Sequence, residues 1–174
     1  MAVFKPTGTL HCVTELTPEL LKALNVHMIV LDVDNTMSPH GSQTPFPGVR
    51  AWAQSVTASG VKLIVVSNNY KKRVAPFAAQ FNLPFVSFAC KPFPVGYLRA
   101  KKMAGTPRRE CLVVGEHNFT HPPGDNLCGL GAGLLDPLSP DPSATVRFKR
   151  SLEGFLRPHY TRLTAGEETV KSKA

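Results

Sequence analysis

The stretch HMIVLDVDNT, residues His27–Thr36, decides the fold prediction because an unbroken apolar run leads directly into two aspartates. Such a run, without polar alternation, is typical of a strand that is buried on both faces, as in the parallel sheets of α/β proteins. Asp32 and Asp34 then stand at the carboxyl end of that strand. If extended geometry continues through them, their side chains share one face and converge on one phosphate or cation.

Two further apolar runs along the chain end in the same way. Val61–Val66 is followed by Ser67 and Asn68, and Cys111–Val114 is followed closely by an acid, Glu116. A weaker run at 84–88 predicts another strand. Helices are predicted from about 17 and over 49–58, 73–81 and 95–103. The alternation predicts an α/β fold with a parallel sheet flanked by helices, whose polar residues meet at the carboxyl edge.

Length and composition indicate one globular domain. The chain has 174 residues, of which 43% are hydrophobic and 18% charged, which is enough to build one core. We expect a domain over 1–160, with a long irregular loop region from Asn118 onward, and a disordered tail over 161–174. No apolar run approaches the roughly 18 residues that span a bilayer, and the first residues do not resemble a secretory signal, so we expect a cytoplasmic protein.

Charge and cysteine usage limit the partners. Twenty Lys and Arg against twelve Asp and Glu give a formal charge of +8, which favours anionic partners. Cys12, Cys90, Cys111 and Cys128 are widely spaced and form no CxxC pair. They are therefore interpreted as reduced thiols rather than as a zinc site or a disulfide framework.

Order and spacing of the motifs carry a family resemblance. The segments LDVDNTMSPHGSQTP, VSNNYKKRV, KPF and the Gly-rich stretch starting VVGE resemble the haloacid dehalogenase (HAD) superfamily of phosphatases, and more narrowly the YqeG family of HAD class IIIA phosphatases. The likeness runs from about Phe4 to Tyr160. It implies a single Rossmann-like domain, and the short distances between the motifs leave no room for a cap domain.

The two aspartates suit phosphoryl transfer, since one carboxylate can attack phosphorus while the other handles the proton of the leaving group. The resemblance implies that Asp32 is the nucleophile, which forms an aspartyl-phosphate. Asp34 would then protonate the leaving oxygen and afterwards activate water. Lys91 would neutralise charge between Asp32 and the phosphate.

The remaining predicted site residues bind substrate and metal. Ser67 can donate a hydrogen bond to a phosphoryl oxygen, with Asn68 nearby, and the resemblance implies that Thr36 supports the aspartate loop. An anionic nucleophile and an anionic substrate repel each other, so this chemistry needs Mg²⁺. The implied metal ligands are Asp32, Asp34 through its backbone carbonyl, and Glu116.

The fourth motif departs from the family pattern. Similar proteins carry Gly-Asp and then Thr-Asp, whereas this chain has Glu116 and His121 at those places. Mg²⁺ requires near-octahedral oxygen geometry, which the longer Glu changes, and His121 is a poor ligand for so hard a cation. Asp125 is an alternative source of a carboxylate. The competing hypotheses are weakened metal binding, and a catalytically impaired pseudophosphatase that serves as a binding scaffold; a transition-metal site at His117 and His121 is a lesser alternative.

An uncapped site favours a large phosphorylated substrate, which must itself exclude water. The family resemblance includes phosphatidylglycerophosphatases, so phosphatidylglycerophosphate is one candidate. The basic stretch 146–160 then has two interpretations, peripheral contact with an anionic membrane or an ordinary terminal helix. Lys71–Arg73 either steers a phosphate or is a solvated helix start. No nucleic-acid partner is expected, since the basic clusters lack interleaved aromatics.

Overall fold

The structure is a computed structural model that describes residues 8–91, 95–115 and 131–135. These residues form one six-stranded sheet flanked by four α-helices and two short 3-10 helices. The strands are β1 (Gly8–Leu10), β2 (Met28–Leu31), β3 (Lys62–Val66), β4 (Phe85–Val86), β5 (Cys111–Gly115) and β6 (Gly131–Leu135). The helices are α1 (Pro18–Ala23), α2 (Val49–Ala58), α3 (Lys71–Ala79), α4 (Val95–Ala104), η1 (Val13–Glu15) and η2 (Arg108–Glu110).

The sheet is parallel throughout, in the order β1-β6-β5-β2-β3-β4. From β2 the chain steps outward to β3 and β4, and then returns to β5 on the other side of β2. Leu31, the last residue of β2, lies opposite Val65 of β3 and Val114 of β5. The carboxyl end of β2 is therefore the point where the strand order reverses, which is where open α/β sheets bind ligands.

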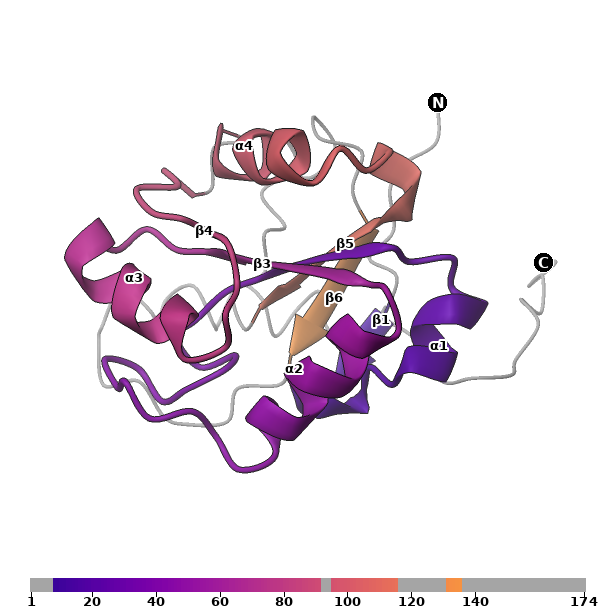
Figure 1. Ribbon diagram of the computed structural model, residues 1–174, viewed down its shortest axis with the longest axis horizontal. Coiled ribbons are helices and arrows are strands. Elements are labelled where there is room, and N and C mark those ends of the chain that lie inside the picture. The colour runs from indigo at the N-terminus through magenta and orange to yellow at the C-terminus, as the bar shows by residue number, and fades with distance from the viewer. Residues whose placement is uncertain (1–7, 92–94, 116–130, 136–174) are drawn as a thin grey trace, which may run out of the picture.

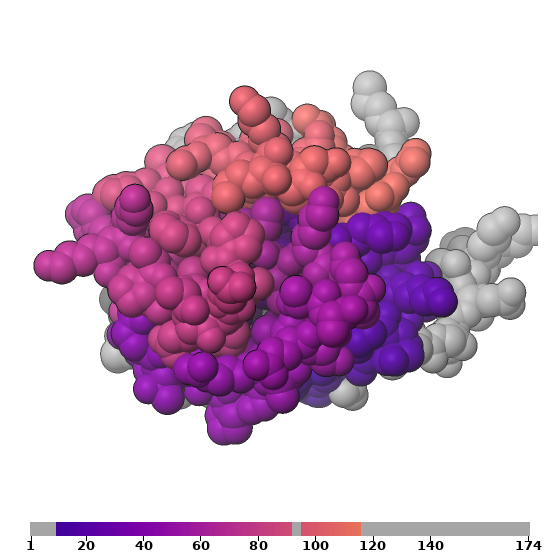
Figure 2. All heavy atoms as spheres, viewed as in Figure 1, coloured from indigo at the N-terminus to yellow at the C-terminus, as the bar shows by residue number. Residues whose placement is uncertain are grey.

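Alternate residues of the central strands pack on opposite faces of the sheet, which explains why their sequences are apolar apart from the exposed Lys62 at the start of β3. In β2, Met28 and Val30 belong to one core cluster, and Ile29 and Leu31 to the other. The first cluster is covered by α4 and the second by α1, α2 and α3, as Figure 1 shows. In Figure 2, which shows the same face, side chains of the helices and of their connecting segments cover the strands.

Local sequence explains the first two helices. Thr17 caps α1, since its hydroxyl accepts a hydrogen bond from the backbone N–H of Leu20, and Pro18 occupies the first helical position as predicted. In α2, Val49, Trp52, Ala53 and Val56 recur at helical spacing and are all buried. These two helices therefore dock on the sheet through one apolar face each.

Two strands depart from the sequence-based expectations. The irregular region expected from Asn118 contains β6, which pairs with β5 on one side and β1 on the other. That expectation was wrong for residues 131–135. The Gly-Ala-Gly sequence of β6 has low strand propensity, but pairing on both sides supplies backbone hydrogen bonds that outweigh it. The strand predicted at 84–88 is confirmed only for Phe85–Val86, and α3 begins two residues earlier than predicted.

The predicted absence of a cap domain is confirmed. Only a loop, α2 and β3 lie between Asp34 and Ser67, and only α3 and β4 lie between Ser67 and Lys91. In the described residues, no helix is long and apolar enough to cross a membrane. The boundary predicted at residue 160, the tail 161–174 and the basic stretch 146–160 lie outside the described residues.

The described cysteines are free thiols, as expected. Cys12 is half-buried, Cys90 is exposed and Cys111 is buried, while Cys128 lies outside the described residues. Burial raises the pKa of the Cys111 thiol, which keeps it uncharged at neutral pH. Cys111 is therefore a neutral core residue of β5.

Candidate active site

The loop after β2 carries both candidate aspartates. The ladder continues for one residue, because the backbone N–H of Asp32 donates to Val114 O at 3.0 Å. The chain then turns tightly, since three successive N–H groups, those of residues 36, 37 and 38, donate to Val33 O. Asn35 takes a positive φ of 56°, which Asn tolerates well. The extended geometry considered for Asp32 and Asp34 is thus wrong beyond Asp32, and a turn brings Asp34 back to the carboxyl edge.

Asp32 is paired with Lys91. The Lys91 ammonium lies 2.7 Å from Asp32 Oδ1, and it also donates to Val66 O at 3.1 Å. The same Oδ1 accepts a hydrogen bond from the Val33 N–H at 2.8 Å. Within the described residues Oδ2 accepts no hydrogen bond, so the carboxylate is fixed through one oxygen while the other is available.

Lys91 is held in place by its backbone. Its N–H donates to Asn68 Oδ1 at 2.7 Å, and its carbonyl accepts from Asn68 Nδ2 at 3.1 Å. Asn68, predicted as a substrate-binding residue, thus has both side-chain polar atoms engaged with Lys91. These two hydrogen bonds join the segment after β4, which carries Lys91, to the end of β3.

A close helix contact also fixes this connection. The Ala89 N–H donates to Ser67 O at 3.1 Å, and Ala89 O accepts from the Gly96 N–H at 3.1 Å. A Cβ atom added to Gly96 would lie 2.5 Å from Ala89 Cβ and 2.9 Å from Ala89 O. Only glycine allows α4 to approach the segment that carries Lys91 so closely.

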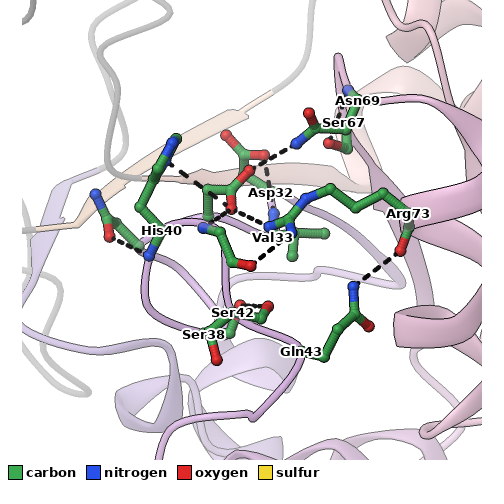
Figure 3. Close-up of polar contacts among 12 residues, drawn as sticks. Asp32, Val33, Ser38, His40, Ser42, Gln43, Ser67, Asn69 and Arg73 are labelled. Atoms are coloured by element: carbon green, nitrogen blue, oxygen red, sulfur yellow. Dashed lines mark hydrogen bonds and ion pairs between the residues drawn. The ribbon is translucent and has the colours of Figure 1, made fainter.

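Asp34 has different partners, since donors occupy both of its oxygens. Oδ1 accepts from the Gly41 N–H at 2.9 Å and from Arg73 at 2.7 Å, and Oδ2 accepts from Asn69 Nδ2 at 2.9 Å. The His40 ring lies 4.0 Å from Oδ1. Figure 3 shows Arg73 reaching from α3 toward the aspartate loop, with Asn69 approaching from the end of β3.

Arg73 also forms hydrogen bonds with the loop that carries Asp34. Its second guanidinium nitrogen donates to Gly41 O at 2.7 Å, and its backbone carbonyl accepts from Gln43 Nε2 at 3.1 Å. Gln80 of the segment after α3 adds a bond to Gln43 O at 2.9 Å. Lys71 and Lys72 are exposed, whereas Arg73 forms a half-buried ion pair with Asp34 and is therefore more than a solvated residue of the helix start. Steering of a phosphate by this cluster stays a prediction.

Ser67 and Thr36 are both buried at this edge. The Ser67 hydroxyl accepts a hydrogen bond from the Asn69 N–H at 3.2 Å. The Thr36 hydroxyl is buried and has no hydrogen-bond partner among the described residues. The structure thus brings Asp32, Asp34, Ser67 and Lys91 to one edge of the sheet, while the roles assigned to these four, to Thr36 and to Asn68 stay predictions.

The described residues contain no group of three or more His, Cys, Asp or Glu side chains that could hold a metal ion. Two oxygen atoms nevertheless have the chemistry that a hard cation prefers. They are Asp32 Oδ2 and the backbone carbonyl of Asp34, which accepts no hydrogen bond within 8–91, 95–115 and 131–135. Glu116 follows β5 directly but lies outside the described residues, as do His117, His121 and Asp125. The predicted role of Glu116 as a metal ligand therefore stays a prediction.

Sequence reasoning missed several residues of this site. Asn69, Gly41 and Gln43 were not singled out, although Asn69 lies in the motif VSNNYKKRV. Asn69 lies between β3 and α3, two residues before the helix begins, whereas Arg73 lies in the first turn of α3. A second polar residue directly after the strand-end serine is the signal that could have found Asn69, but the contact of Arg73 depends on how α3 docks on the sheet.

Comparison with known families gives this geometry a context. Residues 8–116, more than half of the chain, match the family of haloacid dehalogenase-like hydrolases. The chain belongs to this family. The family resemblance of the motifs is thereby confirmed, together with the expectation of a hydrolase.

A relative and two solved structures extend the comparison. The chain is 30% identical over 150 residues to the probable phosphatase YqeG of Bacillus subtilis (strain 168), with 86% of this chain and 87% of that protein covered. Its fold is similar to that of a deoxy-D-mannose-octulosonate 8-phosphate phosphatase of Haemophilus influenzae, solved with cobalt (TM-score 0.50, 13% identity, 64% of this chain and 69% of that one). A putative 3-deoxy-D-manno-octulosonate 8-phosphate phosphatase of Vibrio cholerae is also similar (TM-score 0.51, 12% identity, 66% and 68%). The likeness to these structures confirms the Rossmann-like fold.

Proposed function

We propose that this protein is a Mg²⁺-dependent phosphomonoester hydrolase that acts through an aspartyl-phosphate on Asp32. One observation carries the proposal: Asp32 is fixed through Oδ1 by Lys91 and by a backbone N–H, while Oδ2 accepts no hydrogen bond from the described residues. A nucleophile needs this combination of fixed orientation and an available lone pair. The similarity to a probable phosphatase supports the same reaction.

In the proposed first step, Asp32 Oδ2 attacks phosphorus and the bond from phosphorus to the leaving oxygen breaks. Asp34 gives that oxygen a proton carried on Oδ2, which accepts a single hydrogen bond, from Asn69, within the described residues. Lys91 offsets negative charge beside the reacting phosphoryl group, and the Ser67 hydroxyl donates to one of its oxygens. When bound, Mg²⁺ supplies electrostatic stabilisation of the phosphoryl oxygens, and Asp32, the Asp34 carbonyl and Glu116 are its proposed ligands.

In the proposed second step, the Asp34 carboxylate removes a proton from water, and the water oxygen attacks phosphorus. The bond between phosphorus and Asp32 breaks, which releases inorganic phosphate and restores both aspartates. Arg73, Asn69 and the Gly41 N–H fix both oxygens of Asp34, so the base has a defined direction.

We further propose a substrate large enough to close the site, with phosphatidylglycerophosphate as one candidate. The absence of a cap between the motifs supports this proposal, because a small polar substrate would leave the phosphoryl group in open water. Peripheral contact of the basic stretch 146–160 with an anionic membrane belongs to the same proposal, as does a cytoplasmic location. One domain over 1–160 followed by a disordered tail stays a prediction.

The test is phosphate release from 4-nitrophenyl phosphate and from phosphatidylglycerophosphate, with Mg²⁺ and with a chelator. We expect release that the chelator abolishes and that Asp32→Asn lowers by at least about a thousandfold. Glu19→Gln, which changes an exposed carboxylate of α1, is the matched control and should retain full activity. Equal rates for Asp32→Asn and wild type would remove Asp32 from the mechanism.

The altered fourth motif favours a second candidate, a pseudophosphatase that binds phosphorylated ligands without turnover. Glu116 and His121 stand where similar proteins carry aspartates. This candidate expects no release by wild type and release by the double variant Glu116→Asp, His121→Asp. Turnover by the wild-type protein excludes it.

A further inference from the structure

Two exposed aromatic side chains lie on segments that also carry candidate site residues. Tyr70 is 68% exposed and Phe88 52% exposed, and their rings meet edge to face with centroids 4.8 Å apart. Tyr70 directly precedes α3, and Phe88 follows β4. Apolar side chains that are exposed and in contact with each other form a patch of the kind that ligands or partners cover.

Hydrogen bonds connect this aromatic pair to the catalytic loops. The Phe88 N–H donates to Asn69 O at 3.2 Å, and the Asn69 side chain donates to Asp34 Oδ2 at 2.9 Å. Tyr70 is the next residue after Asn69, and Phe88 lies three residues before Lys91. The pair is therefore positioned by the same segments that hold Asp34 and Lys91.

Phe88 has an unusual backbone conformation. Its φ is 48°, a left-handed value that is a clear outlier for a bulky side chain, and Cys90 has a φ of 55°. Glycine or asparagine would adopt this conformation with less strain. Strained residues that persist in this way cluster at active sites and ligand clamps.

From these observations we propose that Tyr70 and Phe88 form the subsite for the leaving group of the substrate, and that this group carries an apolar aryl or alkyl surface. The inference rests on the proposed phosphatase function and names its substrate class. In a site without a cap, the two rings would cover one side of the leaving group while its phosphoryl end lies at Asp32, Ser67 and Lys91. Stacking or alkyl contact with the rings would provide affinity and exclude water.

The test separates binding from turnover by using n-alkylphosphonates, which cannot be hydrolysed. Binding of ethyl-, butyl- and hexylphosphonate is measured by calorimetry with Mg²⁺ for wild type, Phe88→Gly and Tyr70→Ala. Glycine accepts the positive φ of residue 88, so Phe88→Gly removes the ring without straining the fold. Met103→Ala, at the opposite end of α4 from Lys91, is the matched control for loss of an exposed apolar side chain.

For wild type we expect affinity to rise on the order of tenfold from ethyl- to hexylphosphonate, well below the roughly 200-fold that full burial of four methylenes would give. Both ring variants should lose most of this rise and bind ethylphosphonate within about twofold of wild type, while Met103→Ala keeps the full rise. No measurable binding, no dependence on chain length, or a dependence that both ring variants retain would overturn the inference.

A lipid phosphate and a soluble aryl or alkyl phosphate share this chemistry, so a second arm distinguishes the sources. Phosphate release is measured from soluble hexyl phosphate and from phosphatidylcholine vesicles that contain phosphatidic acid. Release lowered by Phe88→Gly with both substrates supports a leaving-group subsite. An effect with vesicles alone would overturn it, since the rings would then contact the lipid surface. Release from ethyl phosphate tests the proposed activity separately, because it does not need the aromatic pair.

Discussion

Asp32 and Asp34 are two residues apart in one loop, yet the structure gives them different surroundings. Asp32 has one cation, Lys91, on one oxygen, and its second oxygen accepts no hydrogen bond within the described residues. Asp34 has a cation, Arg73, and further donors on both oxygens. The difference is the basis for the two separate roles proposed for these identical side chains: a carboxylate with an available oxygen suits attack on phosphorus, and one oriented by donors on both oxygens suits directed proton transfer.

The largest effect should come from exchanging each carboxylate for an amide. With 4-nitrophenyl phosphate, which has a good leaving group, Asp32→Asn should abolish both the first and the second step. Asp34→Asn should retain the first step and slow the second by about 10²–10⁴-fold, because only the second then needs proton transfer. Rapid-quench kinetics should show a burst of nitrophenol for Asp34→Asn and none for Asp32→Asn. A burst in Asp32→Asn would reverse the assigned roles.

Removal of the positive charge that pairs with Asp32, on Lys91, should have the next largest effect. Lys91→Met keeps the length of the side chain but removes the charge beside Asp32, so we expect kcat to fall by about 10²–10³-fold. Asn68→Ala removes the two bonds that hold the Lys91 backbone and should lower kcat less, by about tenfold. An Asn68→Ala loss that exceeds that of Lys91→Met would place Asn68 on the substrate itself.

Arg73, which pairs with Asp34, should affect the reaction by orienting the Asp34 carboxylate. Arg73→Gln should lower kcat by about 10–100-fold with KM nearly unchanged, because Asp34 loses its fixed direction while phosphate contacts remain. Added guanidinium ions should restore part of kcat. Arg109→Gln is the control, since Arg109 is an exposed residue of η2 that pairs with Glu110 before the amino end of β5, at the opposite edge of the sheet from both aspartates. A rise in KM without change in kcat would assign Arg73 to substrate binding.

A smaller effect is expected where α4 approaches the Lys91 segment. Gly96→Ala places a methyl group 2.5 Å from Ala89 Cβ, so the segment must shift. We expect a loss of about 1–3 kcal/mol in the free energy of unfolding and a partial loss of kcat. Urea denaturation and phosphate release measure the two, with Val95→Ala on the same helix as control. Unchanged stability would show that α4 can move away at no cost.

The smallest effect should come from His40, which lies near Asp34 but is 67% exposed. At 4.0 Å from Asp34 Oδ1 and surrounded by water, its ring contributes little to holding the carboxylate. His40→Gln should change kcat by less than about twofold between pH 6 and 8. A larger change would add His40 to the groups that position Asp34.

Much of this organisation could be predicted from local sequence. The apolar runs that become β2, β3 and β5 have no polar alternation, because both faces of a parallel sheet are covered. Their polar ends therefore had to meet at one edge, which predicts that Ser67 lies near Asp32. Lys91 follows the shorter β4, and the family resemblance implied its role beside Asp32. The helix cap at Thr17 could also be predicted, because it depends only on residues next to it in the sequence.

What sequence reasoning missed depends on contacts between distant segments. Arg73 reaches Asp34 across 39 positions, and its direction follows from how α3 docks on the sheet. β6 is a strand because β1 and β5 pair with it on both sides, despite its two glycines. The aromatic pair of Tyr70 and Phe88 forms only after β3 and β4 align. No local pattern contains this information.

The central claim is that Asp32 carries the phosphoryl group. Asp34→Asn protein is mixed with 4-nitrophenyl phosphate and Mg²⁺, quenched in acid and digested, and the peptides are mapped by mass spectrometry. The account predicts one phosphoryl group per chain, attached to Asp32 and absent from Asp32→Asn protein treated in the same way. A phosphoryl group on any other residue, or release of nitrophenol with no phosphorylated peptide, would contradict it.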